Sequence, residues 1–384
     1  MAEKVRTPLI ERRSRATGLR LACISPTYFA AESVLGGGER FAEELSRALA
    51  ESGGTEVRFV SFGRRALRER PEPALERSIL RSWTRDSMTP FSPRLFRELA
   101  GADVIHCFQR NVLPTFLAAW WGSRRGVPVF VSDLGGGGWT PGYQIDIARW
   151  VTAELPISAY AAADLARAGR RYEVIYGGVD LSRYPPRPRP DHDGSVVFLG
   201  RILPHKGIHH LIEGLPAEVP LHVVGSVADA GYLARLQQLA AGKTVAFHHG
   251  LDDAGIISLL GRAMALVHPT PTDRDGSAGA NELFGLALVE AMACGAPVVA
   301  SRAASLPEIV VDGETGLLVP PNDPAAIAAA VREINADRAR WTSMSAAARK
   351  RVEERFTWRR VAERCLAAYA DLGGVRPKRE KPRE

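Results

Sequence analysis

Two successive series of short apolar runs alternate with helical patterns, and this repetition constrains the fold more than any other feature of the chain. The first series starts at residues 19–25 (LRLACIS) and the second at residues 195–199 (SVVFL). Between them, the segment RYPPRPRPDHDG (183–194) holds four prolines, which exclude a helix interior and a central strand. Since strands that alternate with helices form parallel sheets, the sequence predicts two α/β domains that face each other across a cleft.

The expected boundaries follow from this pattern. We expect a flexible tail at 1–18, a first domain at 19–184, a linker at 185–194, a second domain at 195–355 and a charged tail at 372–384. Expected strands of the first domain are 19–25, 56–62, 103–107, 127–132 and 173–178, and residues 64–100 read as irregular. Expected strands of the second domain are 195–199, 221–225, 245–248, 265–268, 298–300 and 316–319, with helices from 324 to about 370.

Length and composition support a two-domain globular chain. The 384 residues exceed one ordinary core, and no apolar run reaches the ~18 residues of a membrane span. The polar, arginine-rich start is not a secretory signal. The four cysteines lie far apart without a Cys-x-x-Cys pair, which favours reduced thiols in a cytoplasmic protein over a disulfide framework or a zinc site.

The positive charge is concentrated in the first half. Residues 1–190 hold 28 Lys and Arg against 20 Asp and Glu, and the densest arginine cluster spans residues 64–85. No aromatic-interleaved basic motif accompanies it, so we expect no nucleic-acid partner. An anionic membrane surface, a phosphate-bearing acceptor and a simply solvated excess all remain open.

Several residues of the first half follow expected strands, where ligands bind in open parallel sheets. Gly37 and Gly38 lie in a glycine loop before a helical pattern, which suits an anion, although a plain turn remains open and a dinucleotide motif does not fit. His106 ends one strand, with a structural histidine equally compatible. Asp133 precedes four consecutive glycines, which suggests close approach of a ligand or a flexible connection.

The second half carries two cations and two carboxylates. Arg201 and Lys206 follow a strand in GRILPHKG, where a phosphate site and a solvated loop are both open. Glu282 and Glu290 stand in NELFGLALVEAMACGAPVVAS. A glutamate in an apolar run is costly without a partner, so Glu290 is either a buried structural carboxylate or a ligand-binding one. We expect Glu282 in the loop before a helix and Glu290 in its second turn.

The stretches GRILPHKGIHHLIEG, VVGS, ELFGLALVEAMACGAPVVAS and LPEIVVDGETGLLVPPND resemble the retaining nucleotide-sugar glycosyltransferases of family four. The resemblance is specific over residues 195–325 and looser in the first half. It implies the GT-B fold, in which two Rossmann-like domains face a central cleft and a C-terminal helix, here about 356–371, crosses back to the first domain.

The resemblance also implies roles for residues. Arg201 and Lys206 would hold the donor diphosphate, Glu290 the ribose hydroxyls, and Glu282 the transferred sugar. The remaining donor-binding residues would be Gly37, Gly38, Gly225, Phe284, Gly285, Leu286 and Ala287. Asp133 falls where the family usually has a histidine or His-Asp, which leaves His106 and Asp133 as candidate substitutes near the sugar.

The implied reaction is front-face transfer with retention to a glycan or lipid-linked acceptor, in cell-envelope or polysaccharide synthesis. The nucleotide sugar is a co-substrate, and we expect no cofactor and no metal, because cations and helix amides can stabilise the leaving diphosphate. A related sugar-nucleotide epimerase or phosphorylase and a silent binding protein are the alternatives. We expect a cytoplasmic protein with peripheral contact at the inner face of the membrane.

Overall fold

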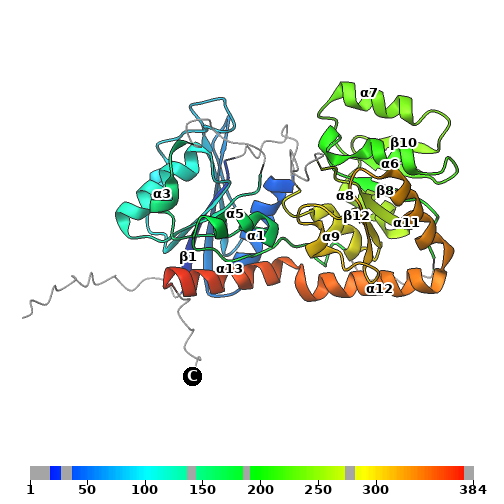
Figure 1. Cartoon of the computed structure of the whole chain (residues 1–384). Helices are drawn as coiled ribbons and strands as arrows, with labels where there is room; N and C mark the ends of the chain where they lie inside the picture. The colour runs from blue at the N-terminus through cyan, green and yellow to red at the C-terminus, as the bar shows by residue number, and fades with distance from the viewer. Residues whose placement is uncertain (1–17, 27–36, 136–143, 185–190, 273–281, 376–384) are drawn as a thin grey trace, which may run out of the picture.

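The computed structural model describes residues 18–26, 37–135, 144–184, 191–272 and 282–375. These residues form two α/β halves that stand side by side (Figure 1). Two consecutive helices, α12 (Arg338–Arg355) and α13 (Trp358–Gly373), run along the base of both halves. The predicted α/β class and the two-sheet architecture are therefore confirmed.

The first half is built on one sheet whose strand order is β3-β4-β2-β1-β5-β6-β7. All neighbours pair in parallel except β3 and β4. The strands are β1 (Leu19–Ile24), β2 (Thr55–Gly63), β3 (Leu67–Glu72), β4 (Leu75–Arg81), β5 (Val104–Phe108), β6 (Val129–Ser132) and β7 (Ala153–Glu154). Buried on both faces, the central strands read as unbroken apolar runs, which is why the sequence revealed them.

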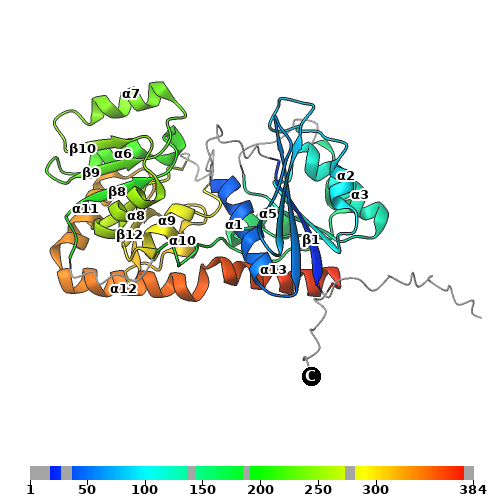
Figure 2. The same ribbon diagram turned by 180° about the vertical axis from the view of Figure 1, so that it is seen from behind.

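Helices cover both faces of this sheet, as the view from behind shows (Figure 2). They are α1 (Gly37–Glu51), α2 (Leu95–Leu99), α3 (Leu113–Arg125) and α5 (Ala159–Arg167). Residues Leu21 and Cys23 of β1 share a core cluster with α1 and α13, whereas Ala22 and Ile24 share one with α2 and α3. This two-residue alternation is the period of a strand.

The second half holds a parallel sheet with the order β10-β9-β8-β11-β12-β13. Its strands are β8 (Val196–Leu199), β9 (Leu221–Val224), β10 (Val245–His248), β11 (Ala265–His268), β12 (Val298–Ser301) and β13 (Gly316–Val319). Its helices are α6 (Ile208–Gly214), α7 (Ala230–Leu239), α8 (Asp253–Arg262), α9 (Leu286–Ala293), α10 (Leu306–Ile309) and α11 (Pro324–Ala336). All six strands expected here are confirmed.

The expectation that residues 64–100 are irregular is wrong. This region holds β3, β4 and α2, and its arginines lie opposite glutamates: Arg77 pairs with Glu43 and Arg68 with Glu98. Pro71 fits within β3 because β3 is an edge strand, where a missing N–H costs no ladder bond. Charge pairing between neighbouring elements therefore orders a segment whose composition resembles a loop.

The strand expected at 173–178 is also wrong. Tyr172 forms an isolated bridge to Glu154 of β7, and the Glu173 and Ile175 N–H groups donate to the carbonyls of Glu154 and Pro156, but no strand forms over these residues. Ile175 and Val179 are buried instead within the core cluster that contains α13, and the Val179 N–H donates to the Phe356 carbonyl. The apolar residues of this segment thus bury themselves against the returning helix.

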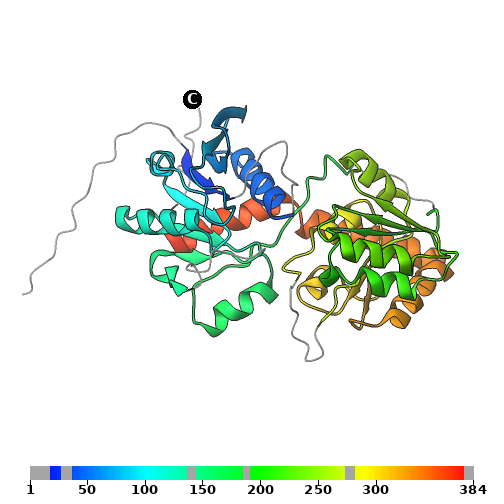
Figure 3. The ribbon, with the colours of Figure 1, turned by 90° about the horizontal axis from the view of Figure 1, so that it is seen from above.

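The returning helix confirms the expected crossover. Helix α13 packs on α1 of the first half, and the rings of Phe41 and Trp358 meet edge to face at 5.1 Å. Viewed from above, α13 lies under the first half and α12 under the second (Figure 3). Of the tails expected at 1–18 and 372–384, residues 1–17 and 376–384 lie outside the described residues, as do the four linker prolines, and α13 extends to Gly373, into the expected second tail. Among the residues described, no helix is long and apolar enough to cross a membrane.

Candidate active site

A cleft of about 730 Å³ lies between the two halves and is lined by both. It contains every predicted donor-binding residue together with Glu282: Gly37, Gly38, Arg201, Lys206, Gly225, Glu282, Phe284, Gly285, Leu286, Ala287 and Glu290. The cleft also includes residues that the sequence analysis did not single out, among them Arg40, His205 and His268. The structure thus gathers groups spread over more than 250 positions into one cavity.

Glu282 stands at the centre of a charged triad in this cleft. The Lys206 Nζ donates to Glu282 Oε2 over 2.5 Å, and His268 Nε2 donates to the same oxygen over 3.0 Å. Burial alone raises the pKa of Glu282, but the charge of Lys206 and the His268 hydrogen bond hold it well below its usual range. Glu282 is therefore a fixed carboxylate, oriented from two sides.

His268 was missed because a lone histidine at a strand end carries no specific signal. Its ring is 2% exposed and stacks on Phe198 at 5.8 Å between centroids. Since a carboxylate only accepts hydrogen bonds, His268 carries a proton on Nε2. That leaves Nδ1 buried without a hydrogen-bond partner among the described residues. Sequence spacing could not show that strand β11 aims this side chain at Glu282.

Helix α9 places both glutamates as the sequence predicts. Glu282 lies in the loop before the helix, and Glu290 is its fifth residue, in the second turn. Gly285 caps the start with a left-handed backbone, φ 96°, and no side chain caps the helix. The first amide groups of α9 therefore face the cleft without a side-chain acceptor, together with the positive end of the helix dipole.

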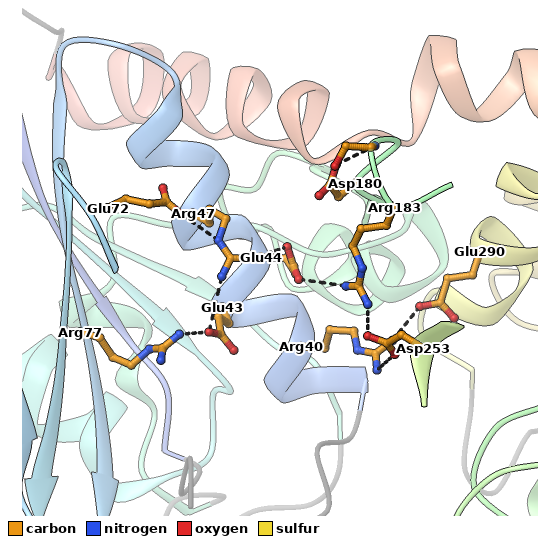
Figure 4. Close-up of polar contacts among 11 residues, drawn as sticks. Arg40, Glu43, Glu44, Arg47, Glu72, Arg77, Asp180, Arg183, Asp253 and Glu290 are labelled. Carbon is orange, nitrogen blue, oxygen red and sulfur yellow. Dashed lines mark hydrogen bonds and ion pairs between the residues drawn. The ribbon is translucent and has the colours of Figure 1, made fainter. Parts of the chain in front are cut away.

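Glu290 is held by a residue of the opposite half. Arg40 on α1 donates through Nη1 to Glu290 Oε1 over 3.1 Å and through Nη2 to Asp253 Oδ1 over 3.4 Å (Figure 4). Asp253 in turn pairs with Arg183. Burial raises the pKa of Glu290 above its ordinary value, and the charge of Arg40 opposes that rise. The carboxylate in the apolar run thus has a partner 250 residues away.

Arg201 and the glycines complete the cleft. Arg201 is exposed and makes no ion pair with the described residues, so its guanidinium is available to an anion. Gly225 lies beside Gly200: a Cβ at Gly225 would come within 1.8 Å of the Gly200 carbonyl oxygen, and φ is 155°. Only glycine fits that close approach of two strand ends.

His106 does not reach the cleft. Its ring is fully buried between β5, β6 and α13, with Nε2 2.9 Å from Ser132 Oγ and Nδ1 2.8 Å from the Tyr369 hydroxyl. Ser132 donates its own proton to the Leu155 carbonyl, so His106 donates from Nε2 and accepts from Tyr369 at Nδ1. Burial lowers the pKa of His106 to about 3, which keeps it neutral. In this geometry His106 binds the returning helix through Tyr369 and lies outside the lining of the cleft.

Asp133 also lies outside the lining of the cleft. It faces an adjoining cavity with Arg110, and its Oδ1 accepts the Gly135 N–H over 3.2 Å. Burial raises the pKa of Asp133. Its neighbours Leu134 and Gly135 do line the cleft, so the structure brings this loop, but not the carboxylate, to the predicted position.

The expectation that no metal takes part stays a prediction. Within the described ranges, no three residues among His, Cys, Asp and Glu are grouped so as to hold a metal ion. The four cysteines all fall in those ranges and form no disulfide.

Two family models match the chain in sequence order. The model described as Glycosyltransferase Family 4 matches residues 35–183, and the model described as Glycosyl transferases group 1 matches residues 185–351. A D-inositol 3-phosphate glycosyltransferase of Geodermatophilus obscurus is 35% identical over 221 residues, 52% of this chain and 47% of that protein. The chain spans about half the length of the curated relatives it matches.

Solved structures resemble the whole architecture. The sucrose-phosphate synthase of Thermosynechococcus elongatus has a TM-score of 0.71 and 23% identity, covering 93% of this chain and 99% of that one. Anabaena HepE, in complex with UDP and glucose, has a TM-score of 0.69 and 19% identity, covering 93% and 100%. Because both halves match in order and share the architecture of these enzymes, the protein belongs to the group 1 glycosyltransferases of family four and has the GT-B fold.

Proposed function

We propose that this protein transfers a sugar from a nucleoside diphosphate donor, a UDP- or GDP-sugar, to an acceptor hydroxyl with retention at the anomeric carbon. The observation that carries the proposal is the convergence of Arg201, Lys206, Glu282 and Glu290 on one cleft. Family membership and the cleft agree on this class of reaction. The acceptor is a glycan or a lipid-linked sugar, in the synthesis of cell-envelope glycans, glycolipids or polysaccharides.

Each charged group has a separate task. Arg201 offers a planar fork to phosphate oxygens, and Lys206 keeps donors beyond the one it gives to Glu282. Glu282, fixed by Lys206 and His268, accepts hydrogen bonds from hydroxyls of the transferred sugar. Glu290 accepts from the ribose hydroxyls through the oxygen that Arg40 does not occupy. The uncapped amides of α9 face the phosphates.

The transfer step proceeds on one face of the sugar. The acceptor oxygen forms a bond to the anomeric carbon while the bond from that carbon to the phosphate oxygen breaks. The bonding pair leaves with the diphosphate, whose oxygen takes the proton of the acceptor hydroxyl. Positive charge from Arg201, Lys206 and the α9 amides stabilises the negative charge that develops on the diphosphate. These groups suffice without a metal ion or a cofactor.

We place the reaction in the cytoplasm, with peripheral contact at the inner face of the membrane. Cys23, Cys107, Cys294 and Cys365 form no disulfide with one another, which fits a reducing compartment. The excess positive charge of the first half fits an anionic surface. The cytoplasmic location and the membrane contact both rest on composition and chemistry. Vesicle binding tests the membrane contact.

The proposed function is tested with a panel of UDP-, GDP- and ADP-sugars, measuring nucleotide release with and without acceptors. We expect release with one donor, retention of anomeric configuration in the product by NMR, and unchanged rates in EDTA. An inverted product, or loss of activity in EDTA that added Mg²⁺ or Mn²⁺ restores, would refute the mechanism. Absence of release with every donor would refute the function.

A further inference from the structure

The structure divides the arginines of residues 58–94 into two groups. One group is paired with glutamates: Arg68 forms ion pairs with Glu76 and Glu98, and Arg77 with Glu43 and Glu69. By contrast, Arg65, Arg81 and Arg94 are exposed and make no ion pair within the described part of the chain. The positive charge predicted for this region is therefore concentrated in the second group.

The second group surrounds one hollow. This basic pocket, about 1070 Å³ in volume, is lined by Arg64, Arg65, Ala66, Arg81, Ser82, Trp83, Ser92, Pro93 and Arg94. Four of the nine residues are arginines, and none of the nine is an aspartate or a glutamate. Such a concentration of like charge raises the local positive potential and favours a bound anion.

The topology explains why these residues meet. Arg64 and Arg65 follow β2, Arg81 ends β4, and Arg94 precedes α2. Strand β2 pairs with β1 up to Val60 and Ile24 and then continues to Gly63. Three further residues extend β2 roughly 10 Å beyond β1. The pocket therefore lies beyond the carboxyl ends of the strands. Helix α1 begins at the same edge of the sheet, and its first residues, Gly37 and Gly38, line the cleft.

We infer that the basic pocket binds a phosphate group of the acceptor or of the surface that carries the acceptor. Guanidinium groups present paired N–H donors that match phosphate oxygens. The site is on the first half, separate from the groups that line the donor cleft, so it can hold a distal phosphate while a hydroxyl enters the cleft. This inference deepens the proposed function. Only the statement that the phosphate belongs to the acceptor rests on that function; phosphate binding by the pocket does not.

Trp83 provides a way to distinguish a lipid headgroup from a soluble molecule as the source of this phosphate. Its side chain is 71% exposed beside the arginines and packs edge to face on Phe91 at 5.7 Å. An indole so placed can enter the interfacial layer of a membrane, where tryptophan is enriched. It adds little to a small, soluble phosphate. Loss of Trp83 should therefore weaken vesicle binding only when the phosphate belongs to a lipid headgroup.

The test compares two charge-matched triple variants of the full chain. The first is Arg65→Gln, Arg81→Gln and Arg94→Gln; the control is Arg235→Gln, Arg332→Gln and Arg355→Gln, three exposed arginines of the second half. Probes are phosphatidylcholine vesicles with and without phosphatidylinositol, measured by co-sedimentation, and inositol 1-phosphate against inositol, measured by calorimetry. For the pocket variant we expect roughly 100-fold weaker binding to phosphatidylinositol vesicles or to inositol 1-phosphate. The control loses the same net charge but should stay within about 2-fold of the unaltered chain, because salt largely screens exposed charges that are far from the bound phosphate.

The outcomes are separable. Equal losses in both triple variants would reduce the effect to net charge and overturn the pocket. Phosphatidylinositol vesicles that bind no better than vesicles of zwitterionic phosphatidylcholine, together with inositol 1-phosphate that binds no better than inositol, would overturn it as well. Binding of inositol 1-phosphate identifies a soluble phosphate; vesicle binding that falls in Trp83→Ala identifies a headgroup. Nucleotide release from the donor without acceptor should be unchanged in the pocket variant. If release fails in the unaltered chain, the proposed function falls while the binding result stands.

Discussion

Replacing Lys206 by methionine tests whether the cleft depends on the Lys206–Glu282 ion pair. The two side chains are 15% and 16% exposed, and their charged atoms are 2.5 Å apart. Methionine keeps the length of the lysine stem but removes its charge. Glu282 would then remain in the cleft with only the His268 hydrogen bond.

The expected cost follows from the burial of the pair. At an effective dielectric constant of ~20, two charges at this distance attract by about 7 kcal/mol. Desolvation of both ions offsets much of that, yet removal of one partner from a buried pair typically costs about 3–5 kcal/mol. Because both groups keep some exposure, we expect Lys206→Met to lower the free energy of unfolding by about 2–4 kcal/mol at pH 7. The double variant Lys206→Met, Glu282→Gln should recover most of it.

The pH dependence gives the sign of the effect. In the unaltered chain the pKa of Glu282 is lowered, so its stabilising contribution is present above the ordinary glutamate pKa and lost as the pH falls through the lowered one. Without Lys206, burial raises this pKa instead. The folded variant then holds a proton that the unfolded chain releases, so its stability decreases as the pH rises above about 4.5. The difference in the free energy of unfolding between the unaltered chain and Lys206→Met should therefore become smaller as the pH is lowered from 7 to 4.5.

Guanidinium denaturation at both pH values measures these differences, and nucleotide release reports the chemistry. We expect turnover of Lys206→Met to fall about 10²–10³-fold, as for loss of one donor to a developing anion. The double variant should recover stability but not turnover. If Lys206→Met were as stable as the double variant at pH 7, the charges of Lys206 and Glu282 would not be energetically coupled. The expected loss of stability would then be wrong.

Three further predictions concern the surrounding contacts. Glu290→Gln should weaken donor binding about 10-fold, measured by calorimetry, because an amide keeps the shape but loses the charged acceptor. Arg40→Met should raise the pH below which donor affinity declines, since Arg40 opposes the burial that raises the pKa of Glu290; Arg47→Met, on the same helix, should leave it unchanged. Tyr369→Phe should lower the free energy of unfolding by about 1–3 kcal/mol, because His106 Nδ1 loses its buried donor, with turnover unaffected.

The second half of the fold was predictable because most of its strands are buried on both faces, as in β8, β11 and β12, and are separated by glycine and proline turns. Each apolar run of four, such as those ending at Leu199 and His268, became a strand. The first half was less predictable. Strands β3 and β4 carry arginines, and β3 also holds Pro71. Ion pairs with glutamates elsewhere in the chain, such as Glu43 and Glu98, support both strands. The local composition of residues 67–81 cannot show which distant glutamates will pair with their arginines.

The same distinction applies to the site. Arg201, Lys206, Glu282 and Glu290 stand in compact motifs, each confined to about twenty residues, and all of them line the cleft. His106 satisfied the rule that ligands bind at the ends of parallel strands, yet α13 returns from the far end of the chain and covers it. A rule about sheet edges cannot anticipate which edge position a distant helix occupies.

Arg40 shows what the assembled structure adds to the motifs. The apolar run around Glu290 raised the question of what compensates a buried carboxylate, and a structural ion pair and a ligand were the two answers. The contact with Arg40 makes these answers compatible, because it uses one oxygen and comes from the opposite half. The pairing favours the charged form of Glu290 and at the same time ties α1 to α9. A motion that separates α1 from α9 breaks this ion pair, so the charge state of Glu290 and the separation of the two helices are physically coupled.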